Sequence, residues 1–219
     1  MDPKQIVARG YDQIAERHHW WAGHTRAEER QRYTDLLLEQ VPAGGSVLEL
    51  GCGVGLPTTR ILAERFQVTG VDLSARHIAL ARQNVPDATF LHGDMTALTF
   101  PSARFDAVVG FYSIIHVPRE EQPGLLRDIA GWLKPGGLFV AAMGTSDVEQ
   151  DILPDWMGAP MYWSHFDTET NRRLVLEAGL QIVQATEETA PEDGVPITFL
   201  WVVARKPDSA AAEVESAGK

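Results

Sequence analysis

Residues 47–55 read Val-Leu-Glu-Leu-Gly-Cys-Gly-Val-Gly, an apolar run that leads into glycines at the alternate positions 51, 53 and 55. A buried parallel strand typically has such a near-continuous apolar sequence. Glycines directly after the strand let a ligand approach the backbone, because no Cβ stands in the way. The stretch therefore predicts a central strand of an α/β sheet followed by a ligand-binding loop.

The ligand of this loop is not expected to be a dinucleotide. The dinucleotide fingerprint Gly-x-Gly-x-x-Gly would place its third glycine at position 56, where this chain has Leu56. In addition, the carboxylate of Glu49 would repel a pyrophosphate. The loop suits a ligand with a cationic end, which argues against a nicotinamide-dependent oxidoreductase.

Length and composition narrow the class of protein. A chain of 219 residues is long enough for one α/β domain with embellishments. Its formal charge of −11 argues against a nucleic-acid groove. The single cysteine, Cys52, fits a reducing compartment. We find no membrane-spanning run and no signal peptide, and we expect a cytoplasmic protein that binds no membrane.

Strand and helix patterns alternate along the chain. Strands are predicted at 47–50, 67–73, 88–92, 105–111, 138–143, 180–186 and 198–205, and helices at 4–40, 57–65, 75–84, 119–133 and 167–179. This order predicts a Rossmann-like α/β fold. Its seven-stranded sheet is mostly parallel, with an antiparallel C-terminal strand and helices on both faces. The linker 191–194 would join the last two strands as an antiparallel pair.

The predicted domain boundaries follow from the same pattern. Residues 1–41 form an N-terminal helical segment and 42–206 the α/β domain, in which 145–166 is an insertion. Residues 207–219 contain no large apolar side chain and are predicted to be a disordered tail.

Residues directly after each predicted strand should converge on one crevice, because ligands of such sheets bind at the carboxyl ends of the strands. Asp72 ends the second strand, and Asp94 and Met95 follow the third. A carboxylate at the end of the second strand is suited to accept hydrogen bonds from ribose hydroxyls. Together with the glycine loop, this order resembles class I S-adenosylmethionine (SAM) methyltransferases over roughly residues 45–145.

The resemblance extends to both ends of the chain. Residues 11–15 (Tyr-Asp-Gln-Ile-Ala) and 160–167 (Pro-Met-Tyr-Trp-Ser-His-Phe-Asp) are similar to stretches of small bacterial SAM-dependent enzymes that methylate small molecules. The N-terminal helical segment often forms a lid over the pocket in that family. The implied cofactor is SAM, and the implied partner is a small-molecule substrate.

The resemblance also implies roles for individual residues. Glu49, Gly51 and Gly53 would hold the methionine end of SAM. Asp72 would accept hydrogen bonds from the ribose hydroxyls, and Leu73 would pack on the adenine. Asp94 and the backbone N–H of Met95 would contact the adenine edge, and the carbonyl of Phe111 would accept from the SAM ammonium. Because Leu56 and Pro57 depart from the usual glycine-rich continuation, contacts beyond Gly55 are not carried over.

Two histidines are candidate catalytic residues. His116 follows the fourth strand, at a place where related methyltransferases carry an active-site histidine, and His165 lies in the insertion. Either could take the proton of a hydroxyl acceptor. The alternative for His116 is a helix-start or core histidine bonded to backbone. The expected substrate-binding residues are aromatic: Tyr11, Trp20, Trp21, Tyr112, Tyr162 and Trp163.

No metal site is expected, because His18, His19 and His24 lack the spacing and the carboxylate of zinc motifs. The sequence thus predicts a SAM-dependent methyltransferase of a small molecule, with oxygen as the favoured acceptor and a monomer or homodimer as the oligomeric state. Transfer to nitrogen or carbon, and a SAM-binding scaffold without methyl transfer, remain as alternatives.

Overall fold

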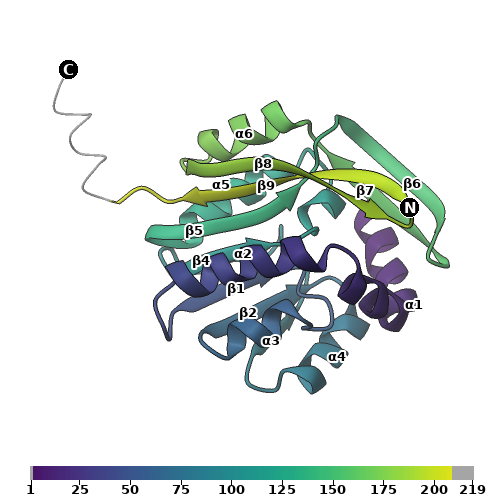
Figure 1. Ribbon diagram of the computed structural model, residues 1–219, viewed down its shortest axis with the longest axis horizontal. Helices are drawn as coiled ribbons and strands as arrows, with labels where there is room; N and C mark the ends of the chain where they lie inside the picture. Colours follow the sequence, from purple (N-terminus) through teal and green to yellow (C-terminus); the bar gives the residue numbers. More distant parts are fainter. Residues whose placement is uncertain (1, 209–219) are drawn as a thin grey trace.

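The computed structural model describes residues 2–208, so most of the tail predicted at 207–219 lies outside the described residues. Its main sheet has seven strands in the order β3-β2-β1-β4-β5-β9-β8 (Figure 1). The strands are β1 (Ser46–Leu50), β2 (Gln67–Asp72), β3 (Thr89–His92), β4 (Phe105–Gly110), β5 (Leu133–Met143), β8 (Gln181–Glu192) and β9 (Val195–Arg205). Strands β1 to β5 pair in parallel, whereas β9 runs antiparallel to both neighbours. The predicted fold class is confirmed.

Helices cover both faces of this sheet. They are α2 (Ala27–Gln40), α3 (Thr58–Ala63), α4 (Ala75–Asn84), α5 (Gln122–Trp132) and α6 (Thr168–Glu177), with a 3₁₀ turn η1 (Ile114–His116) after β4. Side chains alternate along β1, so Val47 packs in the core with α2 and α3, while Leu48 packs with α5 and α6. Burial on both faces explains why the strand sequences are apolar throughout.

The N-terminal segment and the insertion pack together beside the sheet (Figure 1). Helix α1 (Pro3–His24) buries Ile6, Val7 and Ile14 against the second strand of a hairpin, formed by β6 (Val148–Trp156) and β7 (Ala159–His165). A Cβ at Gly10 would lie 2.6 Å from the carbonyl oxygen of Pro160, so this glycine allows the close approach of helix and strand.

Several element boundaries differ from the sequence prediction. Strand β5 begins at Leu133 instead of 138, and helix α5 spans Gln122–Trp132 instead of 119–133. The helix expected over 4–40 is interrupted at Thr25 and Arg26, where Arg26 has φ 55°. The last two strands are longer than predicted and meet at a tight turn in which Asp193 and Gly194 both have positive φ. Their antiparallel pairing is as predicted. The insertion is a β-hairpin, although its strand pairing was not predicted.

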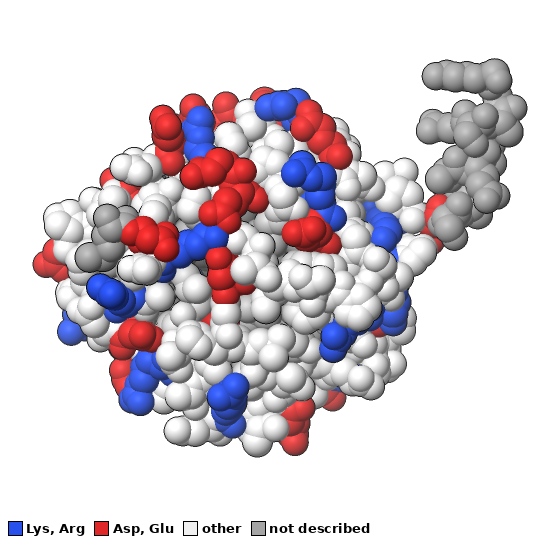
Figure 2. Space-filling model, turned by 180° about the vertical axis from the view of Figure 1, so that it is seen from behind, with Lys and Arg blue, Asp and Glu red and all other residues white. Residues whose placement is uncertain are grey.

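No helix within residues 2–208 is both long enough and apolar enough to cross a membrane. On the face shown in Figure 2, Lys and Arg side chains are interspersed among Asp and Glu side chains.

Candidate functional site

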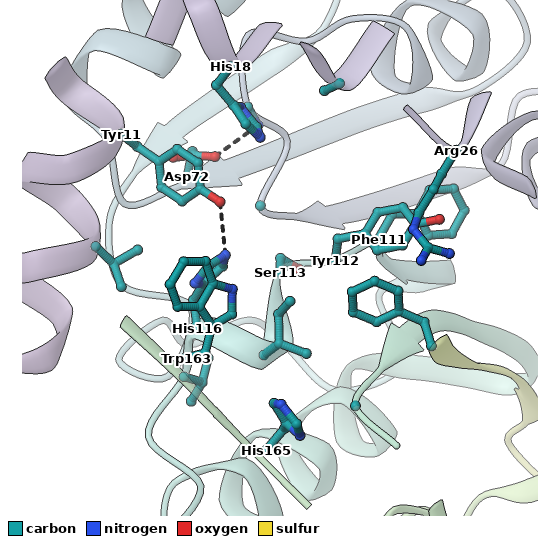
Figure 3. Close-up of a pocket in the computed structure, with 18 of the residues that line it drawn as sticks. Tyr11, His18, Arg26, Asp72, Phe111, Tyr112, Ser113, His116, Trp163 and His165 are labelled. Carbon is teal, nitrogen blue, oxygen red and sulfur yellow. Dashed lines mark hydrogen bonds between the residues drawn. The ribbon is translucent and has the colours of Figure 1, made fainter. Parts of the chain in front are cut away.

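A cavity of about 620 Å³ lies at the carboxyl ends of the parallel strands, as the fold predicts. It has two parts, which we name by their lining. The cofactor lobe is lined by the loops after β1, β2 and β3, and the acceptor lobe by the ends of β4 and β5, the start of β9 and the β6–β7 hairpin. Helix α1 lines the cavity with Lys4, Val7, Tyr11, His18 and Trp21, which recur at helical spacing on one face. Figure 3 shows the central part of this cavity.

In the loop after β1, glycines stand where the backbone conformation and the surrounding space favour them. Gly51 has φ +77°, and a Cβ there would lie 2.3 Å from the Cβ of Ser113. Gly53 has φ +54°, and a Cβ there would meet no atom within 4 Å. Both residues line the cavity. Gly51 is thus required by packing, whereas Gly53 leaves open space where a ligand can approach the backbone.

Glu49 is a buried carboxylate at the cavity, only 4% exposed. Its Oε2 accepts a hydrogen bond of 2.6 Å from the Thr59 hydroxyl. Burial raises the pKa of Glu49 to about 7, and the Thr59 hydrogen bond and the charge of Arg30 oppose this rise. Its carboxylate is therefore poised to be stabilised by a cationic ligand group.

Arg30 is the complementary group that the sequence analysis missed. This α2 residue lines the same cavity, donates to the carbonyls of Ala22 (2.7 Å) and Thr25 (3.3 Å), and lies over the ring of Tyr112 at 5.3 Å. Burial lowers the pKa of Arg30, with Glu49 among the groups that oppose the shift. Among the residues that the structure describes, neither Arg30 nor Glu49 forms an ion pair.

Asp72 lies at the end of β2 with a preorganised carboxylate. Oδ2 accepts from the backbone N–H of Gly53 (2.8 Å), and Oδ1 accepts from the N–H of Ser74 (2.9 Å) and from Nδ1 of His77 (3.3 Å). Burial raises the pKa of Asp72, but the charge of His77 and these hydrogen bonds outweigh burial and lower it. A carboxylate has about four acceptor positions, so a ligand hydroxyl can still be bound.

Asp94 and Met95 line the cofactor lobe, with Leu73 beside them. Both Asp94 oxygens already accept hydrogen bonds: Oδ2 from Lys4 Nζ (2.6 Å), and Oδ1 from the N–H of Thr96 (2.9 Å). Lys4 also donates to Glu121 at 2.5 Å. Burial raises the pKa of Asp94, but the bonds from Lys4 and Thr96 outweigh it and lower the pKa. The sequence analysis did not predict this link between α1 and the cofactor lobe.

His116 is held between two elements at the cavity. Its Nδ1 lies 2.7 Å from the carbonyl oxygen of Tyr162 on β7, so Nδ1 carries the proton. Its Nε2, 2.8 Å from the Tyr11 hydroxyl, is then the acceptor of that hydroxyl (Figure 3). Burial lowers the pKa of His116 to about 4, which keeps the ring neutral. The basic nitrogen of His116 is therefore occupied by α1.

His165, like His116, carries its proton on Nδ1, but its Nε2 has no partner among the described residues. Its Nδ1 lies 2.6 Å from the carbonyl oxygen of Ser146 and is the donor. The ring packs flat on the backbone of Gly144, where a Cβ would lie 2.3 Å from Nδ1. His165 lines the acceptor lobe, and no described side chain or backbone group bonds to its Nε2. This lone pair is free to meet a ligand.

Aromatic rings of α1 and the hairpin form one wall of the cavity. Tyr11 meets Trp156 edge to face at 6.0 Å, and Trp156 meets Trp163 in the same way at 5.5 Å. Trp21, Tyr112, Phe111 and Trp163 all line the cavity. Two predicted substrate-binding residues lie elsewhere: Trp20 is 66% exposed, and the buried Tyr162 side chain packs against α1. Each is adjacent to a lining residue, Trp21 or Trp163, and neighbours in a helix or strand point in different directions.

Residues 2–208 contain no cluster of three or more His, Cys, Asp or Glu side chains that could hold a metal ion.

Comparisons with known proteins agree with this geometry. A family model described as a methyltransferase domain matches residues 47–137. The 2-methyl-6-phytyl-1,4-hydroquinone methyltransferase of Synechocystis is 30% identical over 139 residues, which are 58% of this chain and 43% of that protein. The 27-O-demethylrifamycin SV methyltransferase of Amycolatopsis mediterranei is 30% identical over 152 residues, which are 60% of this chain and 55% of that protein. The chain thus spans about half the length of these relatives.

A solved structure supports the fold over nearly the whole chain. Magnesium protoporphyrin IX methyltransferase from Synechocystis, crystallised with bound SAM, superposes with a TM-score of 0.69 at 16% identity and covers 94% of this chain and 98% of that one. At this identity the match concerns the fold alone. The glycine loop, the strand-end carboxylates, the matched family model and the shared fold all agree: residues 47–137 match a methyltransferase domain, and the chain resembles the class I SAM-dependent methyltransferases.

Proposed function

We propose that this protein transfers a methyl group from SAM to an oxygen atom of a small molecule. The proposal has two parts, the residues that bind the cofactor and the residue that removes the proton of the acceptor. The observation that carries transfer to oxygen is the free Nε2 of His165 in the acceptor lobe.

The cofactor lobe fits SAM. Glu49 and Arg30 present one buried anion and one partly buried cation to the same cavity, and neither is paired with the other. An α-amino acid end, with an ammonium and a carboxylate, complements both charges. The remaining acceptor position of Asp72 suits a ribose hydroxyl, and Leu73 and Met95 supply an apolar surface for the adenine. When bound, SAM supplies a methyl group on a sulfonium, activated for in-line displacement.

His165 would act as general base. Transfer to a hydroxyl breaks the sulfur–methyl bond, forms the oxygen–methyl bond and releases the hydroxyl proton, which passes to His165 Nε2. The Ser146 carbonyl fixes the tautomer that leaves this nitrogen basic. It also stabilises the imidazolium that forms, because the carbonyl oxygen continues to accept from Nδ1.

His116 would act as a positioning residue. Its hydrogen bonds to Tyr11 and to the Tyr162 carbonyl join α1 to the hairpin, so the two walls of the cavity are held at a fixed separation. Its low pKa also makes it a weak base at neutral pH.

Transfer to nitrogen is the second candidate, and the aromatic wall favours it. The faces and edges of Tyr11, Trp156 and Trp163 surround one part of the cavity, and such rings attract cationic amines. An amine acceptor needs no strong base, so loss of His165 would then have little effect.

The test uses SAM with a labelled methyl group and matched hydroxyl and amine acceptors. We expect label in the hydroxyl acceptors, and a His165→Gln rate about 10²- to 10⁴-fold lower, with unchanged affinity for S-adenosylhomocysteine (SAH). His24→Gln, at an exposed histidine outside the cavity lining, serves as the matched control. A wild-type rate in His165→Gln, or label only in amines, would refute transfer to oxygen.

A further inference from the structure

We propose that the acceptor is an uncharged aromatic hydroxy compound that carries a second oxygen, bound between His165 and Tyr112. This inference rests on the proposed function and specifies its substrate class.

The charged groups of the acceptor lobe are already compensated. Arg26 is its buried cation, with a side chain only 2% exposed. The guanidinium donates to Glu192, to Glu29 (3.2 Å) and to the carbonyls of Ala190 and Ile197, and it lies 4.7 Å from the centroid of the Phe199 ring. Asp151, by contrast, lies on the exposed strand β6. Arg30, the unpaired cation that lies over the Tyr112 ring, is assigned above to the carboxylate of SAM. With the cofactor bound, the interior of the lobe therefore offers no further unpaired charge to a carboxylate, a phosphate or an ammonium group of the acceptor.

Most hydroxyls of the lobe are also engaged within the protein. Thr145 donates to the carbonyl of Thr198 at 3.2 Å, and the hydroxyls of Thr198 and Thr189 share a hydrogen bond of 2.8 Å. The Tyr112 hydroxyl is a buried one that has no partner among the described residues. Tyr112 also has φ +57°, a conformation that non-glycine residues adopt at few positions, commonly functional ones.

Nε2 of His165 and the hydroxyl of Tyr112 are thus two polar atoms of the acceptor lobe without a partner among the described residues, and the indole N–H of Trp21 is a third that can only donate. Nε2 is an acceptor and needs a ligand O–H, whereas the Tyr112 hydroxyl can donate to a second ligand oxygen. Both side chains belong to the cavity lining and are drawn in Figure 3. A compound with one hydroxyl and one further oxygen satisfies both.

The rest of the lining selects an apolar, planar body. The cavity lining includes the apolar residues Ile115, Leu153, Trp163, Ile197 and Phe199. Aromatic faces of this kind bind rings by offset or edge-to-face contact. The whole cavity is about 620 Å³ and must also hold the cofactor, which limits the acceptor to a small ring system.

The experiment measures binding and turnover separately. Titration calorimetry in the presence of SAH compares neutral dihydroxynaphthalenes of several substitution patterns with a naphthoate and with a naphthyl trimethylammonium ion. We expect at least one diol to bind about tenfold or more tightly than either charged probe. Tyr112→Phe should lower the affinity for that diol about tenfold and the affinity for the corresponding monohydroxy compound by less than twofold.

Tyr33→Phe is the matched control, because Tyr33 donates to Glu188 (2.8 Å) and does not line the cavity. Tighter binding of a charged probe, or equal loss for diol and monohydroxy compound in Tyr112→Phe, would overturn the substrate class. The binding data test the class without turnover. If diols bind as expected but are never methylated in the presence of SAM, the proposed function fails while the assignment of the acceptor lobe stands.

Discussion

Replacing Arg30 with Met tests whether the cofactor lobe recognises the carboxylate of the SAM amino acid end. The substitution keeps an unbranched apolar stem and removes the guanidinium that lies over Tyr112. It also removes hydrogen bonds to the carbonyls of Ala22 and Thr25, so thermal unfolding must be measured alongside binding.

The expected loss can be derived from the environment of Arg30. A hydrogen bond to a charged group contributes about 1.5–3 kcal/mol, and each 1.4 kcal/mol corresponds to roughly tenfold in affinity. Because Arg30 is partly buried and unpaired in the described chain, solvent screens it little and no protein carboxylate competes with the ligand. We expect the Kd for SAH to rise about 10- to 150-fold.

The assay compares SAH with decarboxylated SAM by titration calorimetry. Arg30→Met should strongly weaken the binding of SAH. The affinity for decarboxylated SAM should stay within about twofold of its wild-type value, because that ligand has no carboxylate for Arg30 to bind. Arg32→Met is the control on the same helix, since exposed Arg32 pairs with Glu188 at 2.7 Å instead. Equal losses for both ligands in Arg30→Met would refute the reasoning.

Three further results are expected. The affinity for SAH should increase as the pH rises through about 7, because the carboxylate form of Glu49 binds the ammonium of the ligand. Glu49→Gln should bind SAH more weakly, and its affinity should not change with pH in this range. Gly51→Ala should destabilise the fold by about 1–3 kcal/mol in chemical denaturation, since its Cβ would clash with Ser113, whereas Gly23→Ala, where a Cβ meets nothing within 4 Å, should not. Lys4→Met should speed hydrogen exchange in the first turns of α1, and unchanged exchange would contradict the role of its ion pairs.

The parts of the fold that were predictable depend on local patterns. The apolar run at β1 and the linker at 191–194 each act within a few residues, and the structure reproduces the strand and the antiparallel pairing that they predict. The β6–β7 hairpin was not predictable in this way. Pro154 lies within its first strand, and its turn places the non-glycine Met157 at φ 56° before Gly158, so the usual hairpin signals are weak.

Site residues at strand ends could be predicted, because the sheet topology places them. Site residues that depend on contacts between distant segments could not. Glu49, Asp72 and Asp94 follow strands, so topology alone brings them to one crevice. Arg30 is one of two arginines on α2, and only the packing of that helix selects it. The two histidines could be distinguished only by their hydrogen bonds, because Tyr11, which occupies His116 Nε2, lies 105 residues away in the chain.

Helix α1 makes contacts in both lobes of the cavity as one rigid body. Its 22 residues extend about 33 Å, with Lys4 at the carboxylates of the cofactor lobe and Trp21 in edge-to-face contact with Trp156 of the hairpin. A rotation that disturbs one end of the helix must therefore displace the other. Since α1 contributes to the lining of both lobes, a displacement of this helix would change the access of donor and acceptor together.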